Sequence, residues 1–323
     1  MKILVTGAKG FIGSQLIQYL EKLTDCSVVG MVRSKQDVYK SSSFELRLGE
    51  IGSSIRQNFN LSDIDVIIHT AGRAHIMNDT SLKPIEEFRR VNTFGTLCLA
   101  RLAAKSGVKR FVFLSSIKVN GELTRPGQYF KPDDVCIPND PYSLSKYEAE
   151  QGLLILAKQM GMEVVIIRPP LVYGRGVKGN FLSLIKWVGR PVPLPFGAID
   201  NKRSLIALDN LVSFINLCAN PKKSPKAANQ IFLISDGKDV STTQLLIKVR
   251  QAFHFQSPLR IKSLLVPIPV FFMLFFAKLL GKSKVANRLF GSLQVDSSKA
   301  QNLLGWKPVV TMDEQLAKMA EEI

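Results

Sequence analysis

Short apolar runs alternate with longer amphipathic segments through the first half of the chain. The apolar runs lie at 2–6, 26–32, 66–69, 110–115 and 163–168. Between them, apolar side chains recur every three or four positions, as in helices, at 11–23, 83–106 and 143–160. Continuous apolar runs separated by helices are typical of parallel sheets covered on both faces. This half therefore predicts a doubly wound α/β sheet.

Beyond about residue 170 the alternation loosens. Proline and glycine cluster at 174–179 and 191–197, and further strands are expected at 204–208 and 230–234. The final third is predicted to be helical, with apolar periodicity at 242–253. We therefore predict a smaller mixed α/β C-terminal lobe made of about 171–200 and 236–323. The sheet domain comprises residues 1–170 together with about 201–235.

Composition narrows the class of protein. Apolar residues make up 46% of the 323 residues and charged residues 21%, which excludes a disordered chain. The four cysteines include no CxxC pair and only three histidines are present, so we expect neither a disulfide scaffold nor a metal site. We expect a cytoplasmic protein without a secretory signal, because the first residues read as a buried strand. The apolar stretch 264–277 is too short to span a bilayer.

The charge is strongly positive and unevenly distributed. The chain has 43 Lys+Arg against 26 Asp+Glu, a formal charge of +17. Between Asp239 and Asp296 there is no acidic residue but eight basic ones. No nucleic-acid motif accompanies them, so we expect no nucleic-acid partner. An anionic membrane surface contacted through 240–295, or an anionic small substrate, fits better, and a solvated basic face beside a buried helix is the alternative.

A glycine-rich turn follows the first apolar run. The sequence TGAKGFIG at 6–13 lies between a predicted strand and a predicted helix. Glycine permits positive φ and a close backbone approach, and a helix N-terminus offers unpaired N–H groups to an anion. The turn therefore predicts a binding site for the pyrophosphate of a dinucleotide, with a purely structural turn as the alternative.

The end of the second apolar run bears on the choice of cofactor. NAD sites usually have Asp or Glu there, which binds the ribose 2′-hydroxyl. Here GMVRSK at 30–35 contains no acid and two cations. Arg33 can instead make a bidentate contact with a 2′-phosphate. We therefore expect NADP(H) in preference to NAD(H), unless Arg33 only caps a loop.

A tyrosine and a lysine stand four positions apart in PYSLSK at 141–146. On a helix, Tyr142 and Lys146 share one face. The ammonium is expected to lower the pKa of Tyr142 and to make proton exchange with a hydroxyl or carbonyl feasible. Ser116 ends a predicted parallel strand, where ligands bind in open α/β sheets. The alternatives are a chance YxxxK on a helix surface and a strand cap for the Ser115–Ser116 pair.

Taken in order, these motifs resemble the extended short-chain dehydrogenase/reductase family, especially its nucleotide-sugar epimerases, dehydratases and reductases. The similarity covers nearly the whole chain. The matching segments are TGxxGFIG at 6–13, HTAG at 69–72, NxxGT at 92–96, SS at 115–116, YxxxK at 142–146, RPxxVYG at 168–174, GN at 179–180, RSxIxxDN at 203–210 and VDxxKAxxxLGWxP at 295–308.

The resemblance implies a Rossmann-type NAD(P)-binding domain, a substrate-binding lobe, a homodimer through the helices that carry Asn92 and Tyr142, and roles for single residues. Tyr142 would be the general acid/base, Lys146 would bind the nicotinamide ribose, and Ser116 would hydrogen-bond the reacting C4 oxygen. The implied cofactor residues are Gly7, Gly10, Phe11, Ile12, Gly13, Ala71, Gly72 and Asn92, with Glu50 and Ile51 on the adenine side. The implied substrate residues are Arg73, His75, Asn180, Arg203 and Arg288.

Departures from the family pattern select among its reactions. The 4,6-dehydratases carry an Asp-Glu pair directly after the catalytic hydroxyl residue, and here Ile117 and Lys118 stand there, so dehydration is not expected. The missing acid near Arg33 favours an NADPH-dependent reductase of a UDP-4-keto-6-deoxy-(N-acetyl)hexose, in surface-polysaccharide synthesis. This enzyme would work in the cytoplasm, at the inner face of the membrane if 240–295 binds lipid.

Three other functions stay open. One is a UDP-glucose or UDP-N-acetylglucosamine 4-epimerase with tightly bound NAD. Another is a flavonoid- or cinnamoyl-type NADPH reductase, which Asn180, Arg203 and the LGW ending disfavour. The most distant is a cofactor-sensing protein without turnover, which the presence of Tyr142, Lys146 and Ser116 disfavours.

Overall fold

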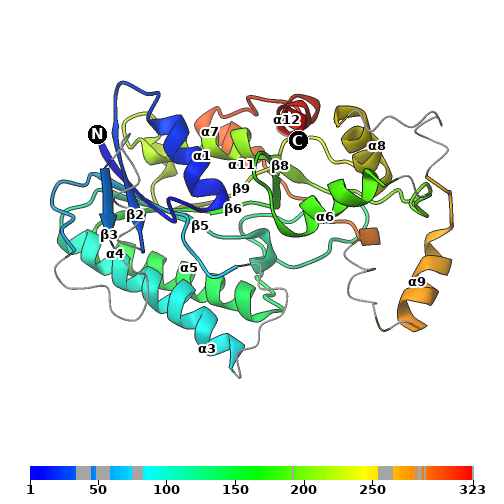
Figure 1. The fold of residues 1–323 in the computed structure, drawn as a ribbon. Coiled ribbons are helices and arrows are strands. Elements are labelled where there is room, and N and C mark those ends of the chain that lie inside the picture. The colour runs from blue at the N-terminus through cyan, green and yellow to red at the C-terminus, as the bar shows by residue number, and fades with distance from the viewer. Residues whose placement is uncertain are drawn as a thin grey trace.

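The fold is that of a computed structural model of the chain (Figure 1). The structure describes residues 1–33, 45–48, 59–74, 83–190, 193–253, 265–279, 281, 286 and 289–321.

A parallel sheet of seven strands forms the centre of the described chain. Its strand order is β3-β2-β1-β4-β5-β6-β9, and every neighbouring pair is parallel. The strands are β1 (Lys2–Thr6), β2 (Ser27–Val32), β3 (Glu45–Leu48), β4 (Val66–His69), β5 (Arg110–Leu114), β6 (Glu163–Arg168) and β9 (Gln230–Leu233). The order reverses between β1 and β4, so ligands are expected outside the carboxyl ends of these strands. The predicted Rossmann-type sheet is confirmed.

Helices cover both faces of the sheet, because successive residues of each buried strand point to opposite sides. In β1, Ile3 and Val5 join the apolar cluster beneath α1 (Phe11–Leu20) and α7 (Leu208–Ala219). Leu4 joins the opposite cluster, beneath α4 (Thr96–Lys105) and α5 (Pro141–Met160). Figure 1 shows the two helical layers on either side of the strands. Both apolar faces of the strands are thus buried.

The segment expected to be one helix over 83–106 consists of three pieces. A short helix, α3 (Pro84–Phe88), leads into a π-helical segment, η1 (Arg89–Gly95), and then into α4. A π-helical turn accommodates an extra residue and is frequent at functional sites. Asn92 lies in the middle of η1 and is buried. The first predicted helix is also shorter than expected, since α1 ends at Leu20.

The later part of the chain adds a second small sheet and more helices. The strands β7 (Leu171–Tyr173) and β8 (Leu205–Ala207) pair in parallel, and β8 continues directly into α7. The further elements are η2 (Ile117–Val119), α6 (Gly179–Val188), η3 (Pro225–Ala227), α8 (Thr242–Ala252), α9 (Val270–Leu279), α11 (Ser298–Leu304) and α12 (Met312–Ala320). A separate apolar cluster joins α6, α8 and α12.

The C-terminal segment returns to the main sheet. Ala300 of α11 and Trp306 belong to the same apolar cluster as Ile3 and Val5. The proposed lobe of 171–200 and 236–323 therefore includes residues that pack on the first domain. In the ranges given above, no helix is long and apolar enough to span a bilayer.

Candidate active site

The glycine turn lies where β1 passes into α1. Gly7 has a φ of +70°, and a Cβ on it would lie 2.9 Å from the Ala71 amide nitrogen. A Cβ on Gly13 would overlap the Gly7 carbonyl oxygen. Glycine is thus required at both positions because the β1 turn, the end of β4 and the first turn of α1 pack backbone against backbone.

The first turn of α1 can bind an anion. Gly10 is its N-cap, without a side-chain cap, and no acidic residue lies in the turn. Its first N–H groups, which include those of Phe11 and Ile12, have no partner within the helix and carry the positive end of its dipole. A pyrophosphate placed against them would meet several donors at once.

Ser116, Tyr142 and Lys146 are brought together by three separate structural features. A capping box between Asp140 and Ser143 starts α5 and puts Tyr142 in its first turn, with Lys146 one turn later. Ser116 follows β5 as the N-cap of η2, where its hydroxyl accepts from the Lys118 amide at 3.3 Å, and it lies close enough to Tyr142 to act on the pKa of the phenol. The three side chains therefore share the carboxyl end of the sheet.

Lys146 connects this group to the predicted cofactor residues. Its ammonium donates a hydrogen bond of 2.9 Å to the Leu114 carbonyl oxygen and lies 4.5 Å from the centre of the Phe113 ring. A Cβ on Gly72 would come within 3.3 Å of the Lys146 nitrogen. A substrate oxygen at Tyr142 and a ribose beside Gly72 would therefore lie within reach of one lysine.

Burial controls the proton affinities of the pair. It raises the pKa of Tyr142 to about 12, with the nearby Ser116 hydroxyl opposing this rise and the Asp140 charge adding to it. Burial lowers the pKa of Lys146 to about 8, and the Glu150 carboxylate opposes this shift. Contrary to the expectation that Lys146 lowers it, the pKa of Tyr142 is raised, because removal from water is the largest effect and the Asp140 charge acts in the same direction. At neutral pH the phenol holds its proton.

A chain of buried hydrogen bonds links the glycine turn to η1. His69 is fully buried, with Nδ1 2.8 Å from the Thr6 hydroxyl and Nε2 2.9 Å from the Thr96 hydroxyl. Thr96 donates to the Asn92 carbonyl oxygen and Thr6 accepts from the Ala71 amide. These directions assign the imidazole proton to Nε2. Burial lowers the pKa of His69 to about 3, so the ring stays neutral.

Asn92 ties the end of β4 to α5. Its side-chain oxygen accepts from the Arg73 amide at 2.8 Å, and its nitrogen donates to the Arg73 carbonyl and to the Ser145 hydroxyl. Ser145 in turn donates to the Tyr142 carbonyl oxygen at 2.7 Å. Asn92 thus holds the backbone beside Gly72 in register with α5.

A buried ion pair supports the same edge of the sheet. Glu150 of α5 and Arg168 at the end of β6 have side chains 0% and 1% exposed, and Arg168 donates through both Nε and Nη2. Glu150 also accepts from the Ser115 hydroxyl, and Arg168 donates to Asn120. The sequence motifs do not single out Glu150. Its position four residues after Lys146, on the buried face of α5, is the feature of the sequence that could have pointed to it.

Other predicted site residues are less closely connected to this group. Arg33 is exposed at the end of β2, next to β1 in the sheet, and Arg73 lies 5.5 Å from the Phe88 ring. Arg203 donates to the Gly291 carbonyl oxygen, and burial lowers its pKa. Asn180 lies in α6. Glu50, Ile51, His75 and Arg288 lie outside the described residues.

Lys118, which replaces an acid of the dehydratase pattern, lies close to Tyr142. Its ammonium lies 2.8 Å from an Asp140 oxygen and 5.9 Å from the centre of the Tyr142 ring. A cation therefore stands where the dehydratase pattern has a carboxylate. The described residues contain no group of three or more His, Cys, Asp and Glu side chains suited to a metal ion.

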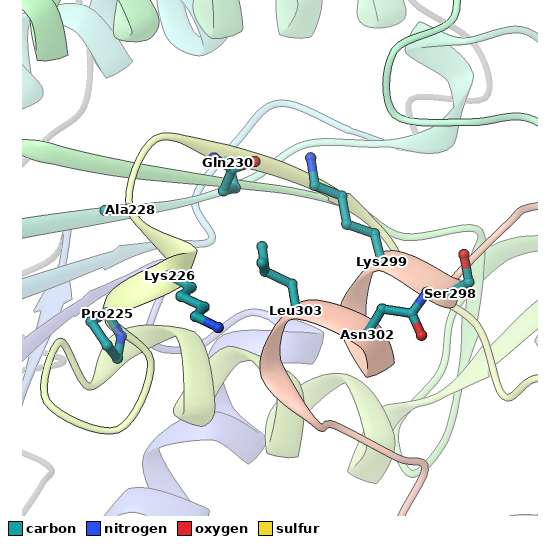
Figure 2. Close-up of a pocket in the computed structure, with 8 residues that line it drawn as sticks. All are labelled: Pro225, Lys226, Ala228, Gln230, Ser298, Lys299, Asn302 and Leu303. Carbon is teal, nitrogen blue, oxygen red and sulfur yellow. The ribbon is translucent and has the colours of Figure 1, made fainter.

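One surface pocket lies elsewhere. Figure 2 shows its lining at the sheet edge formed by β9, between η3 and α11. The lining residues are Pro225, Lys226, Ala228, Gln230, Ser298, Lys299, Asn302 and Leu303. No predicted site residue is among them, so the candidate site is the group around Tyr142.

The fold and the site define a dinucleotide-binding α/β enzyme with a Tyr–Lys pair beside a glycine turn. The sequence matches the NAD dependent epimerase/dehydratase family over residues 3–234, and the chain belongs to that family. A curated relative, the UDP-glucose 4-epimerase of Vibrio cholerae, is 46% identical over 320 residues, which cover 99% of this chain and 94% of the relative. An N-acetyl-α-D-glucosaminyl-diphospho-ditrans,octacis-undecaprenol 4-epimerase of Escherichia coli O157:H7 is 26% identical, covering 83% and 76%.

Solved structures share the fold. The UDP-N-acetylglucosamine 4-epimerase from Bacillus cereus superposes with a TM-score of 0.76 at 19% identity, covering 100% of this chain and 99% of its own. The UDP-glucuronic acid 4-epimerase from Bacillus cereus in complex with NAD gives 0.71 at 23% identity, covering 99% and 98%. The family is NAD-dependent, and these findings do not favour NADP(H) for this chain.

Proposed function

We propose that this protein is a nucleotide-sugar 4-epimerase that uses NAD and acts on a UDP-hexose. The observation that carries the proposal is the placement of Ser116 directly after β5 and of Tyr142 and Lys146 one helical turn apart on α5, with the Lys146 nitrogen beside Gly72. The 46% identity with the UDP-glucose 4-epimerase of Vibrio cholerae supports epimerisation over the reductase favoured from sequence.

Each residue of the site would have one role in this reaction. The turn at Gly7, Gly10 and Gly13 would hold the cofactor pyrophosphate, and Lys146 the ribose beside Gly72. When bound, the nicotinamide supplies hydride transfer to and from C4 of the sugar. Tyr142 would exchange the proton of the C4 oxygen, and Ser116 would hydrogen-bond the same oxygen and fix it at reacting distance.

Dehydration is disfavoured by the residues after Ser116. Ile117 and Lys118 stand where the dehydratases have an Asp-Glu pair, and neither side chain has a carboxyl group to remove a proton from C5 or to protonate a leaving hydroxyl at C6. Ile117 is buried, and Lys118 is paired with Asp140. The chain belongs to the same family as the 4,6-dehydratases but is not expected to catalyse their reaction.

A second candidate is the NADPH-dependent reduction of a UDP-4-keto-6-deoxy-(N-acetyl)hexose. Two observations favour it. Arg33, rather than an acid, directly follows β2, the strand that pairs with β1 ahead of the glycine turn. With its pKa raised to about 12, the Tyr142 phenol holds its proton at neutral pH, as the donor to a ketone oxygen must, and is not available in the phenolate form as a base toward an alcohol.

One set of assays separates the two. Purified protein would be incubated with UDP-glucose or UDP-N-acetylglucosamine without added cofactor, and C4 epimers followed by NMR. In parallel, NADPH oxidation would be followed with the 4-keto sugar. Epimers without added cofactor support the first proposal, and sugar-dependent NADPH consumption supports the second. Cofactor binding without either reaction would contradict both and favour a cofactor sensor.

Two variants serve as controls. Tyr142→Phe should lower the rate of the observed reaction by about 10²–10⁴-fold while the protein still binds cofactor, because only the proton exchange is lost. Arg33→Ala should weaken NADPH binding and leave NADH binding unchanged if the guanidinium contacts a 2′-phosphate. Equal effects on both cofactors would refute that role of Arg33.

A further inference from the structure

Helix α9 carries large apolar side chains on its surface. Phe271, Phe272, Phe275 and Leu279 are 63%, 47%, 58% and 68% exposed. At about 100° per residue, these four positions fall within one arc of about 100° on the helix. Contiguous exposed apolar stripes on soluble proteins mark surfaces that bind something.

The helix stands apart from the sheet. Figure 1 shows α9 at the periphery, beyond α6 and α8. The segment before it is fixed to the body, because the Val266 amide donates to the Leu194 carbonyl at 2.8 Å and the Gly197 amide donates to the Val266 carbonyl at 3.0 Å. A Cβ on Gly197 would lie 2.6 Å from the Leu265 carbonyl oxygen, so these two segments of the chain touch through backbone. The apolar stripe is therefore presented from a fixed base.

The charge around α9 indicates which kind of surface its apolar stripe binds. The sequence holds no acidic residue between Asp239 and Asp296, and Lys278, Lys282 and Lys284 fall on α9 and directly after it. Lys278 is exposed, about 20° from Phe271 around the helix, between Phe271 and Leu274, which is 36% exposed. A segment that combines phenylalanines with lysines and contains no acidic residue has the composition of segments that lie in the interface of an anionic bilayer.

The dimensions indicate how the helix would lie. Ten residues of helix are about 15 Å long, half the thickness of the hydrocarbon core. The helix can therefore lie along the interface but cannot cross it. A second copy of the chain is a poorer partner for the same surface, because it would bring two acid-free cationic segments together.

We propose that α9 docks this protein on an anionic lipid surface, with Phe271, Phe275 and Leu279 inserted at the acyl-chain boundary and Lys278 among the headgroups. The surface is separate from the group around Tyr142, so this proposal does not depend on the reaction catalysed.

The test is co-sedimentation of the full chain with vesicles of phosphatidylcholine alone or with a third phosphatidylglycerol. Wild-type protein should bind the anionic vesicles at low salt, bind less at high salt, and bind the zwitterionic vesicles weakly. Phe271→Ser with Phe275→Ser should reduce partitioning at least about tenfold, since each buried phenylalanine contributes about that factor. Lys278→Glu should reduce binding to the anionic vesicles alone.

A matched control removes exposed apolar side chains elsewhere. Val135 and Ile137 are 84% and 59% exposed and do not lie on α9, so Val135→Ser with Ile137→Ser should leave partitioning unchanged. Three outcomes would overturn the proposal: no binding of wild type to anionic vesicles at low salt, equal losses in both double variants, or conversion of a dimer to a monomer by Phe271→Ser with Phe275→Ser without any vesicle binding. The last would make α9 a contact between copies.

Discussion

Replacing Glu150 by glutamine should strongly destabilise the protein. The change keeps the size of the side chain but removes the negative charge that pairs with Arg168 inside the fold, where the two side chains are 0% and 1% exposed. Arg168 would keep a hydrogen bond to Asn120 but no opposing charge. Breaking a buried pair in this way costs about 3–5 kcal/mol. Equilibrium unfolding in urea, followed by circular dichroism, measures the loss.

The same helix provides the control. Glu148 of α5 pairs with Arg89 in a bidentate contact, but their side chains are 27% and 39% exposed. Water already screens that pair, so Glu148→Gln should cost about 1 kcal/mol or less. Equal losses in the Glu150→Gln and Glu148→Gln proteins would refute the argument from burial.

A double variant isolates the cause. Glu150→Leu with Arg168→Met removes both charges and replaces them with apolar groups of similar volume, which often restores stability. The double variant should be more stable than Glu150→Gln. If it is no more stable than Glu150→Gln, then the unpaired charge of Arg168 is not what destabilises the single variant.

Three further predictions concern the site. Gly13→Ala should lower cofactor affinity at least about tenfold in fluorescence titration, because the added methyl overlaps the Gly7 carbonyl; unchanged affinity would contradict the close approach. The pKa of His69 is 6.5 in the unfolded chain and about 3 in the folded protein, so between these values only the unfolded chain binds a proton at this position. The free energy of unfolding should therefore fall by about 1.5–2 kcal/mol between pH 6.5 and pH 5. His69→Gln should remove that part of the slope, and an unchanged slope would count against it. The pKa of Lys146 is lowered from 10.5 to about 8, so stability should rise by about 2 kcal/mol from pH 8 to 10 relative to Lys146→Met; parallel pH profiles would contradict this.

Elements with strong local patterns could be predicted from the sequence. The strand boundaries of β1 and β4 match the predicted runs, and the glycine turn and the proximity of Tyr142 and Lys146 follow from spacing. Strand β3 was missed because it is only four residues long and its sequence, ELRL, is not a continuous apolar run like those of the other strands. The π-helical η1 was missed because one extra residue barely disturbs an apolar repeat of 24 positions.

The chemistry of the site was harder to predict than its residues. A sequence shows that Lys146 follows Tyr142 but not how far water is excluded from either, and that exclusion decides the direction of the Tyr142 pKa shift. The partner of Glu150 is 18 residues away on another element, so no local pattern pairs it with Arg168. The homodimer and the division of the chain into two domains stay predictions.

The hydrogen-bond chain from Thr6 through His69 and Thr96 to Asn92 has a consequence for ligand affinity. Each of these side chains is already held in one rotamer, so its conformational entropy is lost when the chain folds and not when a ligand arrives. Ordering a side chain on binding costs about 0.5–1.5 kcal/mol, and a preorganised site avoids that loss. Fold stability and cofactor affinity therefore depend on the same bonds. A change such as Thr96→Val should weaken both.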